Sequence, residues 1–392
     1  MVNKYSLILV FLMSLVASAC QKEENTMTDE DQLIQSYFGS NISLNKFDNY
    51  ANQTVPSYIA KNNTFNGNNI NDFGATLGRV LFYDKNLSSN NTVSCASCHI
   101  QSAAFGDTLV QSNGANGTTP RHSMRIVNAS FGADFHFFWD ERAFSAENQA
   151  TFPTKSHNEM GFSGVNGDPS FNDLLVKLAQ LPYYKILFKM VYGDTTVTEP
   201  RMQNALAQFV RSIQSFDAKY DMGRSQVSTD LEPFPNFTPL ENQGKHLFLT
   251  ASVFDANGIR IGGGLGCNEC HNAPEFDIVP NSKNNGLISM IEGNAQDLSI
   301  VRSPSLRDIF NTNGLLNAPL MHTGLVNFNL VLDHYNQIES INSNIDSRLM
   351  PNGMPQNLAL TQAERDAVTA FMKTLSGKDI YTNKKWSDPF VN

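Results

Sequence analysis

The chain has 392 residues, of which 41% are hydrophobic and 17% are charged, and its formal net charge is -9. This length is sufficient for two domains that each have a core of their own, and the composition is typical of a globular protein. Because an acidic chain offers no electrostatic attraction to phosphate backbones, we expect no nucleic-acid partner.

The first twenty residues have the pattern of an export signal. Lys4 precedes the apolar run 7–16, and the small residues 17–19 stand directly before Cys20. The run is too short for an ordinary spanning helix, which leaves a buried N-terminal helix as the alternative. We expect residues 1–20 to be a lipoprotein-type signal peptide. Cleavage and lipid attachment at Cys20 would then anchor the mature protein on the periplasmic side of a bacterial cell envelope.

Residues 21–70 are rich in Asn, Thr, Ser and Glu, so we expect a polar tether with little structure of its own. Residues 77–82 then favour a helix that leads to a C-x-x-C-H motif at 95–99. A polar Gly/Asn loop follows at 111–119.

Pro200 opens an amphipathic pattern that predicts a helix with one buried face. Its apolar positions are Met202, Ala205, Leu206, Phe209, Val210, Ile213 and Phe216. We interpret this stripe as core packing. Residues 222–237 carry Gly, Ser and Pro, and we expect the domain linker there.

The second half begins with a capping-box pattern at 238–241, in which Pro239 stands at the first helical position. A glycine-rich turn at 262–266 precedes the second C-x-x-C-H motif at 267–271. A further capping box at 361–364 predicts a closing helix over 367–375.

The two motifs pair Cys95 with Cys98 and Cys267 with Cys270, and each pair is followed directly by a histidine. This is the attachment signature of haem c. Disulfides in an oxidising compartment are an alternative, and structural zinc is a weaker one because no second ligand pair lies near either motif. We predict two covalently bound haem c groups, with His99 and His271 as the proximal iron ligands.

The expected fold is therefore mainly α, with two cytochrome c-like domains and long loops. We place the N-terminal haem domain at 71–221, the linker at 222–237 and the C-terminal haem domain at 238–380.

Residues 73–377 resemble the bacterial dihaem cytochrome c peroxidases, including their MauG branch. The matching pieces occur in order around the two haem motifs, at 77–84, 138–143, 159–161, 301–307 and 321–324. The resemblance implies that the N-terminal haem is the peroxidatic one and that electrons enter through the C-terminal haem.

The resemblance also implies roles for residues around the first haem. Gln149 and Glu159 would sit over its open face, with Glu159 as the acid–base group. Trp139 would lie between the haems, and Pro153 would lie near the distal pocket or simply form a turn. His157 departs from the family pattern, which has Pro at this position, and is either an added titratable group or a plain loop histidine.

Some relatives close their oxidised peroxidatic haem with a distal histidine on the loop after the first motif. Residues 111–119 contain no histidine, and His122 aligns with a family position that is not that ligand. We therefore predict a peroxidatic iron that needs no reductive ligand release.

For the second haem, the resemblance favours Tyr335 as sixth iron ligand, with Met321 as the alternative. His322 is expected to hydrogen-bond a haem propionate or a water. The family also holds a calcium ion, whose protein ligands map to the Asn128 side chain and the carbonyls of Asn317 and Pro319.

The leading interpretation is a peroxidase that reduces hydrogen peroxide to water with electrons from a small cytochrome c or cupredoxin. One alternative is a MauG-like oxidase that acts on a partner protein through a high-valent iron state. A second is a dihaem electron carrier without catalysis. The resemblance further suggests a homodimer.

Overall fold

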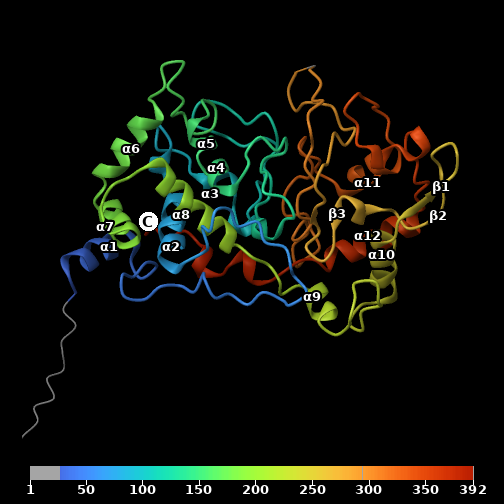
Figure 1. Ribbon diagram of the computed structural model, residues 1–392, viewed down its shortest axis with the longest axis horizontal. Coiled ribbons are helices and arrows are strands. Elements are labelled where there is room, and N and C mark those ends of the chain that lie inside the picture. The colour runs from blue at the N-terminus through green and yellow to red at the C-terminus, as the bar shows by residue number, and fades with distance from the viewer. Residues whose placement is uncertain (1–26, 294, 392) are drawn as a thin grey trace, which may run out of the picture.

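The computed structural model describes residues 27–293 and 295–391. Figure 1 shows two helical halves side by side, the N-terminal half in blue to green and the C-terminal half in yellow to red. The predicted signal peptide 1–20 and the anchor residue Cys20 lie outside the described residues.

The described residues are rich in helix and long loops, in agreement with the predicted mainly α fold. The helices of the N-terminal half are α1 Asp29–Phe38, α2 Asp72–Tyr83, α3 Cys95–Cys98, α4 Ala146–Ala150, α5 Phe152–Lys155, α6 Phe171–Gln180, α7 Pro182–Tyr192 and α8 Glu199–Ser212. They are followed by α9 Lys219–Arg224, α10 Pro239–Leu249, α11 Phe328–Asn336 and α12 Gln362–Lys373. Two small antiparallel sheets pair β1 Ser252–Phe254 with β2 Arg260–Gly263, and β3 His271–Asn272 with β4 Asp277–Ile278.

Both predicted capping boxes are confirmed. Thr238 caps α10 and exchanges hydrogen bonds with Glu241, and Thr361 caps α12 and exchanges them with Glu364. These reciprocal bonds satisfy backbone N–H groups that have no partner within the helix, so each helix begins where the sequence indicates.

The amphipathic pattern after Pro200 is confirmed as α8, but the helix ends at Ser212. Phe216 lies beyond it and packs edge-on against Phe131, with 4.9 Å between ring centroids. The apolar spacing continued past the end of the helix because the following segment is buried as well.

Each half is built around two helices whose backbones are in contact where they cross. A Cβ atom added to Gly78 of α2 would lie 2.0 Å from the carbonyl oxygen of Ala205 in α8. A Cβ atom on Gly244 of α10 would lie 1.9 Å from the carbonyl oxygen of Ala367 in α12. Only glycine permits this approach at either crossing. The two halves therefore share one helix-crossing arrangement.

The buried apolar residues form two clusters that follow the two halves. The first gathers around α2 and α8, the second around α10 and α12. The C-terminal segment departs from this division, because Ile380 and Trp386 belong to the first cluster. Figure 1 shows this red segment returning beneath the N-terminal half. The tail is held there by Arg79, whose Nε donates to the Ser387 carbonyl at 2.7 Å.

The expected polar tether at 21–70 is corrected by the structure over its described part. Ile34 and Phe38 of α1 are buried, as is Tyr50. Phe38 also contacts Phe390 of the C-terminal tail, with ring centroids 5.0 Å apart. Ile34 and Phe38 lie four residues apart on one face of α1. A segment that is polar on average therefore carries a narrow buried stripe that its composition does not reveal.

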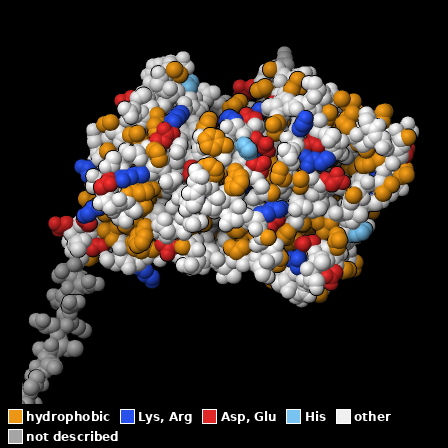
Figure 2. All heavy atoms as spheres, viewed as in Figure 1, with side chains coloured by type: hydrophobic (Ala, Val, Ile, Leu, Met, Phe, Trp, Pro, Cys, Tyr) orange, Lys and Arg blue, Asp and Glu red, His pale blue; other side chains and the backbone are white. Residues whose placement is uncertain are grey.

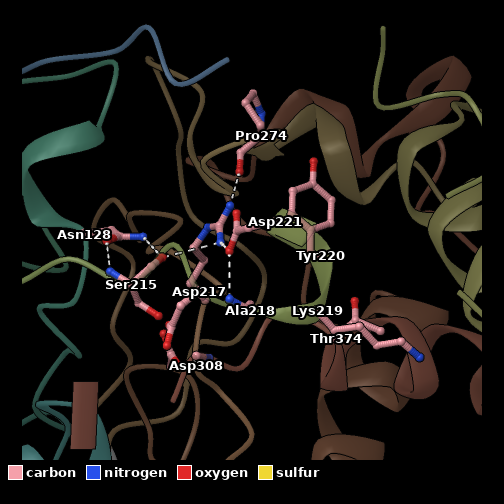
Figure 3. Close-up of polar contacts among 12 residues, drawn as sticks. Asn128, Ser215, Asp217, Ala218, Lys219, Tyr220, Asp221, Pro274, Asp308 and Thr374 are labelled. Carbon is pink, nitrogen blue, oxygen red and sulfur yellow. Dashed lines mark hydrogen bonds and ion pairs between the residues drawn. The ribbon is translucent and has the colours of Figure 1, made fainter. Parts of the chain in front are cut away.

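The join between the halves centres on the fully buried Arg307, whose partners Asp221 and Pro274 are labelled in Figure 3. Its Nη1 donates to Asp221 Oδ2 at 2.9 Å, and its Nη2 donates to the Pro274 carbonyl at 3.0 Å. The predicted linker 222–237 is packed against the rest of the structure, since its first residues continue helix α9, which carries Asp221, and Phe234 packs in the second cluster. A buried guanidinium is tolerated only when it is paired in this way.

The surface seen in Figure 2 carries acidic and basic side chains interspersed with hydrophobic ones.

Within residues 27–293 and 295–391, no helix combines the length and the apolar character needed to cross a bilayer.

The helix crossings can be tested with Gly244→Ala. Because the new methyl group would overlap the Ala367 carbonyl, we expect the free energy of unfolding to fall by about 1–3 kcal/mol in denaturant titrations. Gly262→Ala is the matched control, since nothing lies within 4 Å of its added Cβ. Equal stabilities of the two variants would contradict the crossing geometry.

Candidate functional site

Two cavities bring together residues that are distant in sequence. The first is about 480 Å³ and is lined, among others, by Cys95, Cys98, His99, Trp139, Gln149, Pro153 and Glu159. The second is about 180 Å³ and is lined, among others, by Trp139, Cys267, Cys270, His271, Pro319, Met321 and Tyr335. Each C-x-x-C-H motif therefore lies in the wall of a cavity of its own.

Both cavities take a wall from the helix pair that crosses at glycine. In the first, α2 contributes Phe82 and α8 contributes Leu206, Ala207 and Val210. In the second, α10 contributes Phe248 and α12 contributes Val368 and Met372. These apolar walls suit a large flat hydrophobic group.

The cysteines of both motifs are free thiols, and no disulfide links any of the described cysteines. Cys95 and Cys98 occupy a single helical turn, in which the His99 amide donates to the Cys95 carbonyl at 2.9 Å. The second motif makes a similar turn, in which the Cys270 amide donates to the Cys267 carbonyl at 3.2 Å. Each turn presents two thiols and a histidine to one cavity.

The motif histidines are oriented by backbone carbonyls. His99 Nδ1 lies 3.3 Å from the Phe105 carbonyl oxygen, and His271 Nδ1 lies 2.9 Å from that of Pro304. A carbonyl accepts only from N–H, so these contacts assign the proton to Nδ1 and leave the Nε2 lone pair free for a metal. Burial lowers the pKa of both imidazoles, that of His271 to about 4. Neutral imidazole, paired thiols and apolar walls together fit a haem c at each motif.

Glu159 lies in the turn after α5, where its backbone amide donates to Ser156 Oγ at 3.3 Å. Burial raises the pKa of its carboxyl above the usual range, while Arg142 and the Ser156 hydroxyl act in the opposite direction. Glu159 therefore holds its proton to a higher pH than an exposed glutamate. A carboxyl of this kind suits proton transfer inside the first cavity.

Trp139 is 8% exposed and lines both cavities. Its Nε1 donates to the His122 carbonyl at 2.7 Å, which fixes the indole in place. The ring packs edge-on against His322, with centroids 6.1 Å apart. His322 is 1% exposed, and neither of its ring nitrogens has a hydrogen-bond partner among the described residues.

Of the residues predicted to ligate calcium, Asn128 and Asn317 line neither cavity, whereas Pro319 lines the second. Asn128 Oδ1 accepts from the Ser215 amide at 2.8 Å, which leaves one of its lone pairs unused (Figure 3). Asn317 Nδ2 donates to the Asp308 carbonyl at 2.7 Å. The described residues hold no group of three or more His, Cys, Asp or Glu suited to a metal. The predicted set relies on an amide and carbonyl oxygens, so the calcium ion stays a prediction.

His157 does not line the first cavity. Its Nδ1 lies 2.8 Å from Asp168 Oδ2 on a partly exposed loop. This position agrees with the plain loop histidine and gives it no contact with the cavity.

Sequence reasoning missed the cationic residues at the seam between the cavities. Arg125 and Arg302 line both, and Arg142 lines the first. Arg125 Nη2 donates to the Ser305 carbonyl at 3.2 Å, and Arg302 donates to the His136 carbonyl. Guanidinium groups here could pair with the carboxylates of a porphyrin. The only signal in the sequence was their position in apolar segments, where an arginine requires a partner.

The raised pKa of the partly buried Glu159 carboxyl predicts a pH-dependent stability. A carboxyl whose pKa is higher in the folded state than in the unfolded state lowers the free energy of unfolding when it ionises. This cost is absent below the pKa of the unfolded state and grows as pH rises through the pKa of the folded state. We expect Glu159→Gln to raise the melting temperature at pH 7 and to leave it unchanged near pH 4.

Glu241→Gln is the control for this experiment. Burial alone would raise the pKa of Glu241, but Lys219 and Thr238 lower it overall. As pH rises, this variant should therefore become less stable relative to the wild type. If the melting temperature of Glu159→Gln depended on pH in the same way as that of Glu241→Gln, the raised pKa of Glu159 would be contradicted.

The chain matches known proteins over most of its length. Residues 73–226 match the family model of the di-haem cytochrome c peroxidases. The methylamine utilization protein MauG of Methylorubrum extorquens is 28% identical over 77% of this chain and 78% of its own. Cytochrome c551 peroxidase of Nitrosomonas europaea is 26% identical over 77% and 80%.

A solved structure of a MauG-like protein associated with microbial copper homeostasis superposes with a TM-score of 0.66 at 26% identity. It covers 86% of this chain and 99% of that one. These findings confirm the resemblance predicted from the sequence motifs. The chain is therefore similar to the di-haem cytochrome c peroxidases and to the MauG proteins.

Proposed function

We propose that this protein is a dihaem c-type peroxidase that reduces hydrogen peroxide to water. Cys95, Cys98 and His99 would hold the haem of the first cavity, and Cys267, Cys270 and His271 that of the second. When bound, the two groups supply redox-active iron, for O–O cleavage at the first site and for electron entry at the second. The single observation that carries the proposal is the Glu159 carboxyl, with its raised pKa, in the wall of the first cavity.

Glu159 would serve as the acid–base group. Its carboxylate takes the proton from one oxygen of peroxide and delivers it to the oxygen that leaves as water. Gln149 lines the same cavity from α4, and its side-chain amide can donate to peroxide and orient it. Apolar walls limit access of bulk water to this proton transfer.

Electrons would enter at the second site from a small cytochrome c or cupredoxin. Trp139 lines both cavities and would carry them across the seam. The donor is a periplasmic protein in this proposal, which matches the expected export signal and the lipid anchor at Cys20. The calcium ion held by Asn128, Asn317 and Pro319 belongs to the same proposal, and His322 would donate to a haem propionate.

A MauG-like oxidase acting on a partner protein is the second candidate. It is favoured by Tyr335, which lines the second cavity where a tyrosine could bind iron. Met321 lines the same cavity, so the geometry brings both candidate ligands to the site. A plain electron carrier would need neither Glu159 nor Gln149.

The peroxidase proposal is tested by mixing the haem-loaded protein lacking residues 1–20 with hydrogen peroxide and reduced cytochrome c. We expect rapid cytochrome oxidation that falls by about 10²–10⁴-fold in Glu159→Gln, because proton transfer is lost. The exposed Glu339→Gln should match the wild type. Slow cytochrome oxidation combined with oxidation of a partner protein would shift the assignment to the MauG-like candidate.

The sixth ligand of the second haem can be assigned from paired variants. We expect Tyr335→Phe to change the electron paramagnetic resonance spectrum of one oxidised haem, because an anionic oxygen ligand is removed. Met321→Leu should leave that spectrum unchanged. The reverse pattern would assign Met321 instead.

A further inference from the structure

Three tyrosines form a continuous path from the region of the first motif toward the surface. Tyr184 and Tyr183 lie on α7 and their ring centroids are 4.7 Å apart. Tyr183 and Tyr37 of α1 are also 4.7 Å apart. Tyr184 is fully buried, Tyr183 is 2% exposed, and Tyr37 is half-buried. The rings are thus in direct contact along a line that leads outward.

One end of this path lies beside the first haem motif. Cys95 packs against the hydrophobic cluster that contains Tyr184. Helix α2 contacts both α7, which carries Tyr184, and α3, which carries Cys95. Tyr184 therefore lies in the same core as the residue that we assign to haem attachment.

A single buried carboxylate serves both inner tyrosines. Asp84 caps the C-terminus of α2 and is 3% exposed. Its Oδ2 accepts from Tyr183 Oη at 2.7 Å and from Tyr184 Oη at 2.8 Å. Burial, and then the charge of Asp84, raise the pKa of both phenols. Both phenols therefore keep their protons in the resting protein and have a base in contact when an electron is removed.

Two other tyrosines of the same core, the buried Tyr50 and the partly buried Tyr83, lack such a base. Tyr50 Oη donates to the Lys385 carbonyl at 2.6 Å, and Tyr83 Oη donates to the Trp386 carbonyl at 2.6 Å. A backbone carbonyl accepts a hydrogen bond but does not take up a proton at neutral pH. Within the first cluster, the carboxylate partner distinguishes Tyr183 and Tyr184 from Tyr50 and Tyr83.

We propose that Tyr184, Tyr183 and Tyr37 form a one-electron relay that carries oxidising equivalents from the first site to the surface when no reduced donor is present. The proposal rests on the proposed function, in which hydrogen peroxide is the oxidant at that site. Tyr184 loses one electron to the oxidised first site, and its phenolic proton moves to Asp84 Oδ2. This leaves a neutral tyrosyl radical.

The next step returns the proton and moves the radical outward. Tyr183 gives one electron to the Tyr184 radical, Asp84 gives its proton back to Tyr184, and the Tyr183 phenolic proton takes its place on Oδ2. Tyr37 then reduces Tyr183, which recovers its proton from Asp84, while Tyr37 loses its own proton to solvent. A one-electron reductant in solution, such as a phenol or ascorbate, restores Tyr37.

The relay predicts a tyrosyl radical that can be observed apart from turnover. Haem-loaded protein is mixed with hydrogen peroxide without cytochrome c, frozen, and examined by electron paramagnetic resonance. We expect a tyrosyl signal that is mostly lost in Tyr184→Phe and retained in Tyr50→Phe. A spin trap followed by peptide mass spectrometry should label Tyr37 in the wild type but not in Tyr183→Phe.

Asp84→Asn provides a second test that keeps all three rings. It should lower the radical yield while the haem absorption spectrum confirms that the variant is folded and loaded. An unchanged radical signal in Tyr184→Phe, or no tyrosyl signal in a wild type that still turns over peroxide with reduced cytochrome c, would overturn the relay and leave the peroxidase standing. Failure to react with peroxide at all would overturn both.

Discussion

The contact between two helix backbones at Gly78, and again at Gly244, is the constraint on which both sites depend. Side chains of the crossing helices form one wall of each cavity, so the distance between the helices sets the width of the space beside each motif. A larger residue at either crossing would displace that wall. The same helix crossing at a glycine in both halves explains how two sites of one kind arise in a single chain.

The halves differ in what surrounds their cavities. Glu159 and Gln149 line only the first, where a raised carboxyl pKa suits proton transfer, whereas the second is lined by Glu269, Asp346 and Gln356. Trp139 is shared and is held by the His122 carbonyl. Arg307 and Asp221 bind the connecting segment to both halves, so the relative position of the two cavities is tied to a buried ion pair.

The sequence predicted the parts whose signals are local. Capping boxes located α10 and α12, and the two motifs located the thiols and histidines, because these features depend on residues within a few positions. The packed segment after residue 27 and the return of Trp386 to the first core were not predicted, since both depend on contacts across the whole chain. The seam arginines were missed for the same reason: partners such as Ser305 lie far from Arg125 in sequence.

If the two sites are as we propose, each motif holds one haem in its own cavity. The most direct measurement is the intact mass of the exported protein and of two double variants, one lacking Cys95 and Cys98 and the other lacking Cys267 and Cys270. The account predicts two covalent haem groups in the wild type and one in each variant. A wild-type mass without haem, or a variant that keeps both groups, would contradict it.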